Sequence, residues 1–295
     1  MPGFINWKVR CGMVEVLKAG FYTTIQDFGR FGFQRYGVPY SGVMDRYAAG
    51  FANSILGNKV DAAVLEMTMT GATLRFDCDT VISIAGADML PHRNEKSLPL
   101  YKAVKINKGD VLSFGKCITG FRCYLAVLGG FKTQGLMHSQ SMCKGITDVF
   151  FISKNQTLEI GINNSFSITK SAYVKVKIDY INTSNLNVFK GPEFDYLSKS
   201  QQEFLLKNQF VISKEHNRMA YQLEGVMENQ LKPIITSAVL PGTVQLTPSG
   251  TLIVLMRDCQ TTGGYPRVLQ LADASINTLS QKFTGEPIHF TLSEF

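Results

Sequence analysis

Short runs of β-branched and aromatic residues recur along this chain, and residues that favour turns separate them. Clear examples of such runs are Val81–Ala85, Val111–Phe114, Cys123–Leu128, Leu252–Met256 and Ile288–Leu292. The turn signals between runs include Lys108-Gly109-Asp110, Gly129-Gly130, Pro248-Ser249-Gly250 and Thr284-Gly285. Many short strands at this spacing are typical of β-barrels and β-sandwiches. The sequence therefore predicts a mainly β fold.

A few short helices interrupt the β pattern. We expect three of them, over Asp45–Leu56, Asp195–Lys207 and Ala272–Phe283. In the first, apolar residues recur at i, i+3, i+4 and i+7, and Gly57 follows as a stop signal. The second is the weaker prediction because its first half is mostly polar.

Composition excludes several classes of protein. Of the 295 residues, 45% are hydrophobic and 18% are charged, unlike a disordered chain. The apolar runs fall far short of the roughly 20 residues that cross a bilayer, so no membrane association is expected. The net charge is +7, but the basic residues are scattered singly. This argues against nucleic acid and is compatible with anionic ligands or a negatively charged partner subunit.

The most linker-like stretch is Asn182–Asn187, which is polar and without periodicity. It predicts a first domain over residues 13–182 and a second over residues 187–295. Residues 1–12 are expected to be an extension that precedes the first strand. They carry no apolar segment of the kind found in secretory signals, so a cytoplasmic location is expected.

Metal and cofactor motifs are lacking in the sequence. The six cysteines form no C-x-x-C pair and the four histidines show no i, i+4 pairing, so no metal site is expected and the thiols are predicted to be free. The chain also has no G-x-x-x-x-G-K-[ST] phosphate loop, no G-x-S-x-G elbow and no G-x-G-x-x-G.

One glycine-rich cluster precedes the first predicted helix. It contains Thr23–Arg30 and Gly37–Asp45. A helix start carries unpaired N–H groups that can hold an anion, and Arg30 could add a bidentate contact. Alternatively, Asp45 or Ser41 caps the helix and Arg30 pairs with Asp27.

A second cluster, Asp258–Pro266, follows the apolar run Leu252–Met256. Its hydroxyls and glycines could present backbone N–H groups as an anion-binding nest, with Asp258 as acid or base and Tyr265 as an aromatic wall. Alternatively, Gly263-Gly264 makes a tight turn with positive φ.

Two further residues carry charge in β-like surroundings. Arg218 could clamp an anion or pair between strands, and the residues alone leave both open. Glu66 is a lone carboxylate within an apolar run, for which exposure to solvent is expected because alternate strand residues point outward.

These motifs resemble the allophanate hydrolase subunit 2 family, also called the biotin-dependent carboxyltransferase family. The matching N-terminal segments are Thr24–Arg30, Gly37–Asp45, Ala52-Asn53, Leu56–Asn58 and Leu65-Glu66. The matching C-terminal segments are Asn217–Met219, Leu223–Gly225, Gly242–Gln245 and Asp258–Pro266. The resemblance runs from Met13 to about Leu292.

The resemblance implies cyclophilin-like β-barrels, two of them in this chain. It also implies one component of an ATP-dependent 5-oxoprolinase, which hydrolyses 5-oxo-L-proline to L-glutamate together with subunits A and B and is inactive without them. ATP, with or without Mg, would be a co-substrate, and no tightly bound cofactor is expected. Phosphorylation of the lactam oxygen would create a good leaving group.

Two other functions fit the same resemblance. One is the carboxyltransferase component of a biotin-dependent urea or amide carboxylase. The other is a non-catalytic regulatory protein that antagonises a kinase inhibitor. The sequence departs from the family pattern at Ala220, at Gln222 and in the glycine-poor stretch Gly145–Phe151, so the substrate could be a related amide.

We assign catalytic roles to Asp45 and Asp258. The residues expected to bind substrate or phosphate are Arg30, Ser41, Gly42, Arg218, Gln260, Thr261, Gly263, Gly264 and Tyr265. This assignment rests on the hypothesis that the two glycine-rich loops meet in one electropositive groove.

Overall fold

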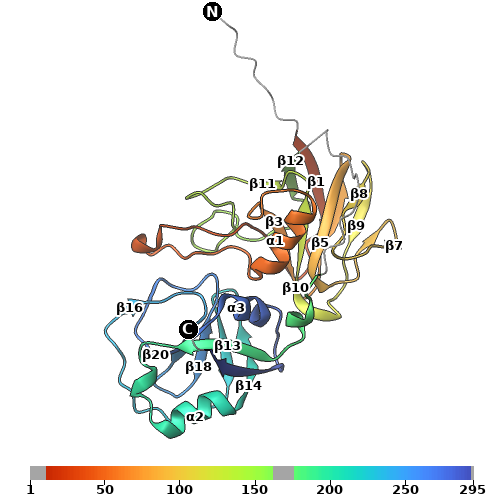
Figure 1. Cartoon of the computed structure of the whole chain (residues 1–295). Coiled ribbons are helices and arrows are strands. Elements are labelled where there is room, and N and C mark those ends of the chain that lie inside the picture. Colours follow the sequence, from red (N-terminus) through yellow and green to blue (C-terminus); the bar gives the residue numbers. More distant parts are fainter. Residues whose placement is uncertain (1–10, 162–175, 294–295) are drawn as a thin grey trace, which may run out of the picture.

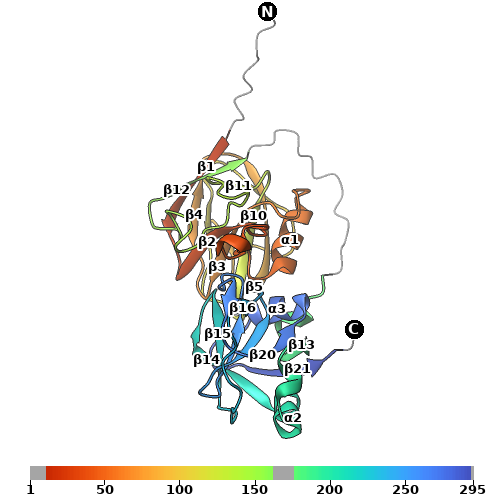
Figure 2. The same cartoon turned by 90° about the vertical axis from the view of Figure 1, so that its left-hand side faces the viewer.

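A computed structural model describes residues 11–161 and 176–293. The strands fall into two halves that lie one above the other in both views (Figures 1 and 2). Strands from residues 11–161 form the first half, and strands from residues 185–292 form the second. The first strand begins at Cys11 and pairs with Gly161. The last two residues of the predicted extension therefore belong to the fold, and residues 1–10 lie outside the described residues.

The first half contains two sheets that share one core. The seven-stranded sheet has the order β11-β12-β1-β4-β9-β6-β7, and its strands are β1 (Cys11–Lys18), β4 (Thr73–Phe76), β6 (His92–Arg93), β7 (Lys96–Ser97), β9 (Val111–Ser113), β11 (Phe131–Lys132) and β12 (Thr157–Gly161). The five-stranded sheet has the order β2-β3-β10-β5-β8, and its strands are β2 (Tyr22–Gln26), β3 (Val64–Thr68), β5 (Thr80–Asp88), β8 (Val104–Ile106) and β10 (Thr119–Val127).

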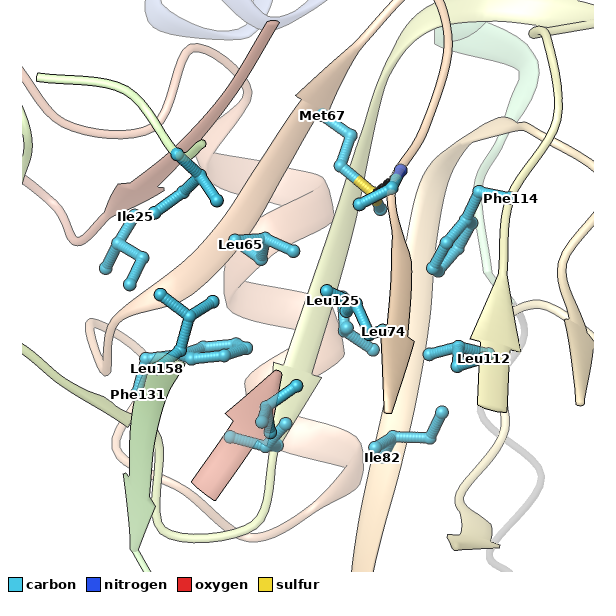
Figure 3. Close-up of a cluster of buried hydrophobic side chains, with 14 of the residues drawn as sticks. Ile25, Leu65, Met67, Leu74, Ile82, Leu112, Phe114, Leu125, Phe131 and Leu158 are labelled. Atoms are coloured by element: carbon cyan, nitrogen blue, oxygen red, sulfur yellow. Dashed lines mark hydrogen bonds between the residues drawn. The ribbon is translucent and has the colours of Figure 1, made fainter. Parts of the chain in front are cut away.

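Side chains from both sheets of the first half fill the space between them. Leu74 and Leu158 come from the seven-stranded sheet, and Leu65 and Leu125 come from the five-stranded one (Figure 3). All four are buried. Removing such apolar surface from water is the main stabilising contribution in this half. The predicted closed barrel is wrong here, because strand pairing gives two separate sheets.

The second half is a closed seven-stranded barrel, as predicted. Its order is β13-β20-β17-β18-β15-β14-β21. The strands are β13 (Asn185–Lys190), β14 (Gln209–His216), β15 (Ala220–Glu224), β17 (Thr243–Leu246), β18 (Leu252–Leu255), β20 (Arg267–Leu271) and β21 (Pro287–Leu292). Strand β13 closes the barrel by pairing parallel with β21 from Asn185 onward. The predicted linker Asn182–Asn187 therefore ends inside a strand. A separate pair, β16 (Ser237–Ala238) and β19 (Thr262–Gly263), lies beside the barrel.

Three helices occur within the described residues, in the regions where the sequence predicts them. They are α1 (Arg46–Ile55), α2 (Lys199–Lys207) and α3 (Asp273–Ser280), with short 3-10 turns at Gln34–Tyr36, Asp179–Ile181 and Phe194–Tyr196. Helix α2 begins later than predicted because Ser198 caps it in a reciprocal capping box with Gln201. None of the helices described in residues 11–161 and 176–293 has the length and apolar character that a membrane span needs.

Gln281, directly after α3, joins the two halves. Its side-chain oxygen accepts from the backbone N–H groups of Phe121 and Arg122, each at 3.0 Å. Its amide nitrogen donates to the Asp45 carboxylate at 2.9 Å and to the Arg122 carbonyl at 3.0 Å. The side chain is fully buried and makes four hydrogen bonds, so its loss would leave several polar groups without partners.

Replacing Gln281 by Ala should lower the free energy of unfolding by about 3 kcal/mol, because two buried N–H groups lose their acceptor. Urea denaturation of the purified chain measures the change. Gln230→Ala serves as the control because Gln230 is exposed and should change stability by less than about 0.5 kcal/mol. Equal effects of the two substitutions would contradict the role given to Gln281.

Candidate functional site

A groove of about 1290 Å³ lies where the two halves meet. From the first half it is lined by residues that include Tyr22, Lys116, Phe121, Cys143 and Lys144. From the second half its lining includes Lys214, His216, Arg218, Asp258 and Phe283. Its position between two packed units, with apolar walls and a few charged groups, is typical of ligand sites.

Arg218 lies at the inner wall of the groove and carries the densest polar contacts there. Its Nε donates to Asp258 Oδ2 at 2.8 Å and its Nη2 donates to Asp258 Oδ1 at 3.0 Å, a bidentate pair. Its Nη1 donates to Glu66 and its Nη2 also donates to the Gly42 carbonyl at 2.5 Å. Burial alone would lower the pKa of Arg218, but Asp258 and Glu66 outweigh this effect and raise it. The guanidinium is therefore permanently charged.

The two predicted loops meet at this arginine. Ser41 from the first loop donates through Oγ to Asp258 Oδ1 at 2.9 Å, and its backbone N–H donates to the Arg257 carbonyl at 2.8 Å. Gly42 has a φ of +91°, and a Cβ there would lie 2.8 Å from the Gly29 nitrogen, so only glycine fits. The structure thus brings Ser41, Gly42, Arg218 and Asp258 together.

Glu66 is buried, so the predicted exposure of this carboxylate is wrong. Its strand β3 is covered on both faces, and alternation therefore places no side chain in solvent. Besides Arg218, it accepts from the Met44 N–H at 2.8 Å and lies 4.0 Å from Arg122 Nε. Glu66 therefore neutralises buried guanidinium charge from both halves.

Asp45 caps helix α1 and lies away from the groove. It is fully buried, and its Oδ1 accepts from the Ala48 N–H at 3.0 Å. Tyr180 donates to its Oδ2 at 2.6 Å. Burial raises the pKa of Asp45, and the hydrogen bonds of Tyr180, Ala48 and Gln281 oppose that rise. Asp45 therefore caps the helix, which is the alternative that the sequence left open, and it does not line the groove.

Arg30 is also fully buried and does not line the groove. Its Nη2 donates to the Ser141 carbonyl, while its Nε and Nη1 have no hydrogen-bond partner. The predicted partner Asp27 instead accepts from Ser139 Oγ at 2.7 Å and from the Gln140 N–H at 2.6 Å. Burial lowers the pKa of Arg30, and the nearby Cys143 and Asp27 oppose that effect.

The rest of the second predicted cluster lies apart from the groove. Thr261 and Gly264 accept through their carbonyls from the N–H groups of Val239 and Ile234. Gly263 pairs with Ser237 in the two-stranded sheet of β16 and β19. Neither Gly263 nor Gly264 has the positive φ that the alternative of a tight turn predicted. The groove lining contains none of Gln260, Thr261, Gly263, Gly264 and Tyr265. Of the residues in the predicted single groove, only Arg218 and Asp258 line it.

Three lysines make the open part of the groove electropositive. Lys116, Lys144 and Lys214 line it and are exposed, with Glu286 and Asp258 as the opposing carboxylates. Exposed ammonium groups attract anions over distances up to the screening length of about 8–10 Å. Such a groove is suited to a small ligand that carries a carboxylate or phosphate. In residues 11–161 and 176–293 no cluster of three or more His, Cys, Asp or Glu side chains has the arrangement of a metal site.

Sequence reasoning gives no role in the groove to His216, Tyr22 or Cys143. His216 packs against the rings of Phe121 and Tyr221, at centroid distances of 5.5 and 4.9 Å. Its Nδ1 is buried without a hydrogen-bond partner. Tyr22 and His216 lie in β-strands, and Cys143 is far in sequence from the two predicted loops. No local sequence pattern therefore marks any of the three as a groove residue.

A family match covers most of the chain. The model of the "Carboxyltransferase domain, subdomain A and B" family matches residues 36–292. The chain belongs to this family. Membership of the carboxyltransferase family agrees with the motifs in both glycine-rich loops. Of the residues that carry the family motifs, Arg218 and Asp258 line the groove.

Curated relatives of this carboxyltransferase-family chain include 5-oxoprolinase subunits and urea amidolyases. The C subunit of 5-oxoprolinase from Escherichia coli is 30% identical over 94% of this chain and 90% of its own length. The Haemophilus influenzae protein of the same name is 28% identical over the same shares. The urea amidolyase of Lachancea kluyveri is 41% identical over 128 residues, which are 43% of this chain and 7% of that protein.

Solved structures share the fold at lower identity. The crystal structure of TTHA0988 superposes with a TM-score of 0.84 and 24% identity, over 96% of this chain and 56% of that one. The urea carboxylase of Kluyveromyces lactis superposes with a TM-score of 0.86 and 22% identity, over 98% of this chain and 28% of that one. This carboxyltransferase fold therefore also occurs within longer chains, of which this chain spans about half or less.

Replacing Glu66 by Gln should lower the free energy of unfolding by about 3–5 kcal/mol, because Arg218 loses one of its two buried counter-charges. Chemical denaturation at pH 7 measures the loss. Glu15→Gln is the matched control, since Glu15 pairs with Arg75 at the exposed surface and should cost less than about 1 kcal/mol. A loss at Glu66 no larger than at Glu15 would contradict the proposed neutralisation.

Acidification should destabilise the chain partly through His216. Burial and the neighbouring Arg122 lower the pKa of His216 below its ordinary value. The unfolded chain therefore binds a proton at a higher pH than the folded chain does, and stability falls as pH decreases through that window. His216→Gln should flatten the change in urea midpoint between pH 7.5 and pH 5.5, whereas His92→Gln should leave it as in the wild type. An unchanged slope in His216→Gln would contradict this.

Proposed function

We propose that this chain is the C subunit of an ATP-dependent 5-oxoprolinase, which hydrolyses 5-oxo-L-proline to L-glutamate together with subunits A and B. The observation that carries the proposal is the 30% identity with the E. coli protein over 90% of that protein's length. A match along nearly the whole of both chains favours the same role more strongly than a shared segment does.

The charge of the groove supports this substrate class. 5-Oxoproline carries a carboxylate next to a planar lactam, and the groove offers exposed lysines beside the apolar rings of Phe121 and Phe283. The lysine ammonium groups would hold the carboxylate, and the rings would pack against the apolar ring carbons.

Asp258 is the group that we assign to proton transfer. It lines the groove, and its side chain is 15% exposed. The bidentate contact with Arg218 and the Ser41 hydroxyl fix its orientation. While Arg218 keeps the Asp258 carboxylate in place, that carboxylate could accept a proton from an attacking water. In this proposal ATP is a co-substrate of the assembled enzyme and supplies the driving force for opening the lactam.

A second candidate function is carboxyl transfer to urea or a related amide. It is favoured by the 41% identity with urea amidolyase over 128 residues, which exceeds the identity with the 5-oxoprolinase relative. The same groove could bind the planar amide. The two candidates differ in the carboxyl donor, so supplying ATP with 5-oxoproline, or carboxybiotin with urea, separates them.

Co-expression with subunits A and B should give ATP-dependent release of glutamate from 5-oxoproline, and omission of any one chain should abolish it. A stable complex without turnover would contradict the enzymatic role and favour a regulatory one. Turnover of urea with carboxybiotin, but not of 5-oxoproline, would instead support the second candidate.

Within the active complex, Asp258→Asn should lower kcat by at least about 100-fold, the usual contribution of a positioned acid or base. Asp258→Asn also removes one of the two counter-charges of Arg218, so its melting temperature should fall as that of Glu66→Gln does. The kcat values of the two variants are therefore compared at a temperature at which both are folded. Lys144→Ala should mainly raise KM, whereas Lys207→Ala, which removes an exposed helix ion pair outside the groove, should change neither constant. Full activity of Asp258→Asn would contradict the role given to this carboxylate.

A further inference from the structure

Arg257 precedes Asp258 in the chain but does not line the groove. Asp258 contacts Arg218, but its neighbour Arg257 lies toward the start of helix α3, with its Nη1 3.9 Å from Asp273 Oδ1. Arg257 is 2% exposed, and its Nε and Nη2 have no hydrogen-bond partner. Buried guanidinium groups are normally paired, so two free donors on one buried arginine are unusual.

A second arginine adds to the same charge. Arg46 is the first residue of α1, and its backbone N–H donates to Asn277 Oδ1 of α3 at 3.0 Å. Its guanidinium lies 5.3 Å from the Phe31 ring centroid and donates from Nη2 to the Phe28 carbonyl at 3.1 Å. Its buried Nε has no hydrogen-bond partner. Burial, and then the charge of Arg46, lower the pKa of Arg257 to about 10, so the two cations repel each other.

The carboxylates near this pair do not satisfy it. Asp273 is 86% exposed as a side chain, and at 3.9 Å its oxygen is beyond hydrogen-bond distance of Arg257. Asp45 is nearby, but its oxygens already accept from Ala48, Tyr180 and Gln281. Three buried guanidinium nitrogens, Arg46 Nε and Arg257 Nε and Nη2, therefore lack a hydrogen-bond acceptor.

We propose that Arg46 and Arg257 form a binding site for a phosphate group, between the starts of helices α1 and α3. A phosphate has several acceptor oxygens and a charge near −2, so it can serve donors on two guanidinium groups at once. Neither arginine lines the groove, and the site is thus separate from the one that holds Asp258. Arg46 is only partly buried and Asp273 is exposed, so both border solvent. The site stands whether or not the chain belongs to a 5-oxoprolinase.

The test is thermal unfolding and calorimetric titration of the full chain with inorganic phosphate, against sodium chloride at equal ionic strength. Phosphate should raise the melting temperature by a few degrees and saturate at one site. Arg257→Gln and Arg46→Gln should each lose the shift, whereas Arg75→Gln, at the exposed surface, should keep it. Because Arg46 is only partly buried, its variant tests the site even if Arg257→Gln folds poorly.

Two further titrations identify the source of the phosphate group and the role of Asp273. ATP that shifts the melting temperature at lower concentration than phosphate would assign the site to a nucleotide phosphate, and a stronger response to phosphate itself would assign it to the free ion. Asp273→Asn should bind phosphate more tightly, because it removes the only exposed carboxylate described beside the pair. No shift beyond that of chloride, or the same shift in both arginine variants, would overturn the proposal.

Discussion

The fold of this carboxyltransferase-family chain depends on one buried guanidinium. Arg218 comes from the barrel, Glu66 comes from the five-stranded sheet, and Asp258 follows strand β18 of the barrel. Burying ions is unfavourable unless their geometry and hydrogen bonds compensate, and here all the Arg218 side-chain nitrogens have acceptors. The pairing therefore requires both halves to adopt one relative position, and that position creates the groove.

The surrounding contacts are polar as well, which distinguishes the junction from the cores on either side. Arg122 donates to the Tyr221 hydroxyl at 2.6 Å and to the Ser280 carbonyl at 2.5 Å, so the first half reaches deep into the second. Gln281 makes the reciprocal contact from the second half. A network of this kind orients its members more narrowly than apolar packing does. Asp258 is consequently held at the groove wall by its hydrogen bonds with Arg218 and Ser41.

Local sequence patterns predict most elements but misjudge several side chains. The helix at Asp45 follows from the helical spacing of its apolar residues, and the barrel strand at Leu252 follows from an uninterrupted apolar run. The alternating pattern predicts that Glu66 is exposed, because it assumes that one face of the strand contacts solvent. Strand β3 has no such face, since all of its residues are buried. Because Tyr265 is close in sequence to Asp258, it is predicted to lie in the groove. Instead it follows strand β19, which pairs with β16, and it does not line the groove.

The sequence by itself determined the mainly β character, the positions of the helices and the two loops whose motifs mark the family. These features depend on neighbouring residues, and they can therefore be inferred from short stretches of chain. Only the tertiary structure decided that Ser41 meets Asp258 across 217 positions and that Arg218 meets Glu66 across 152. Charge compensation between distant segments has no local pattern, because each partner is defined by its distance in space and by its shared exclusion from water.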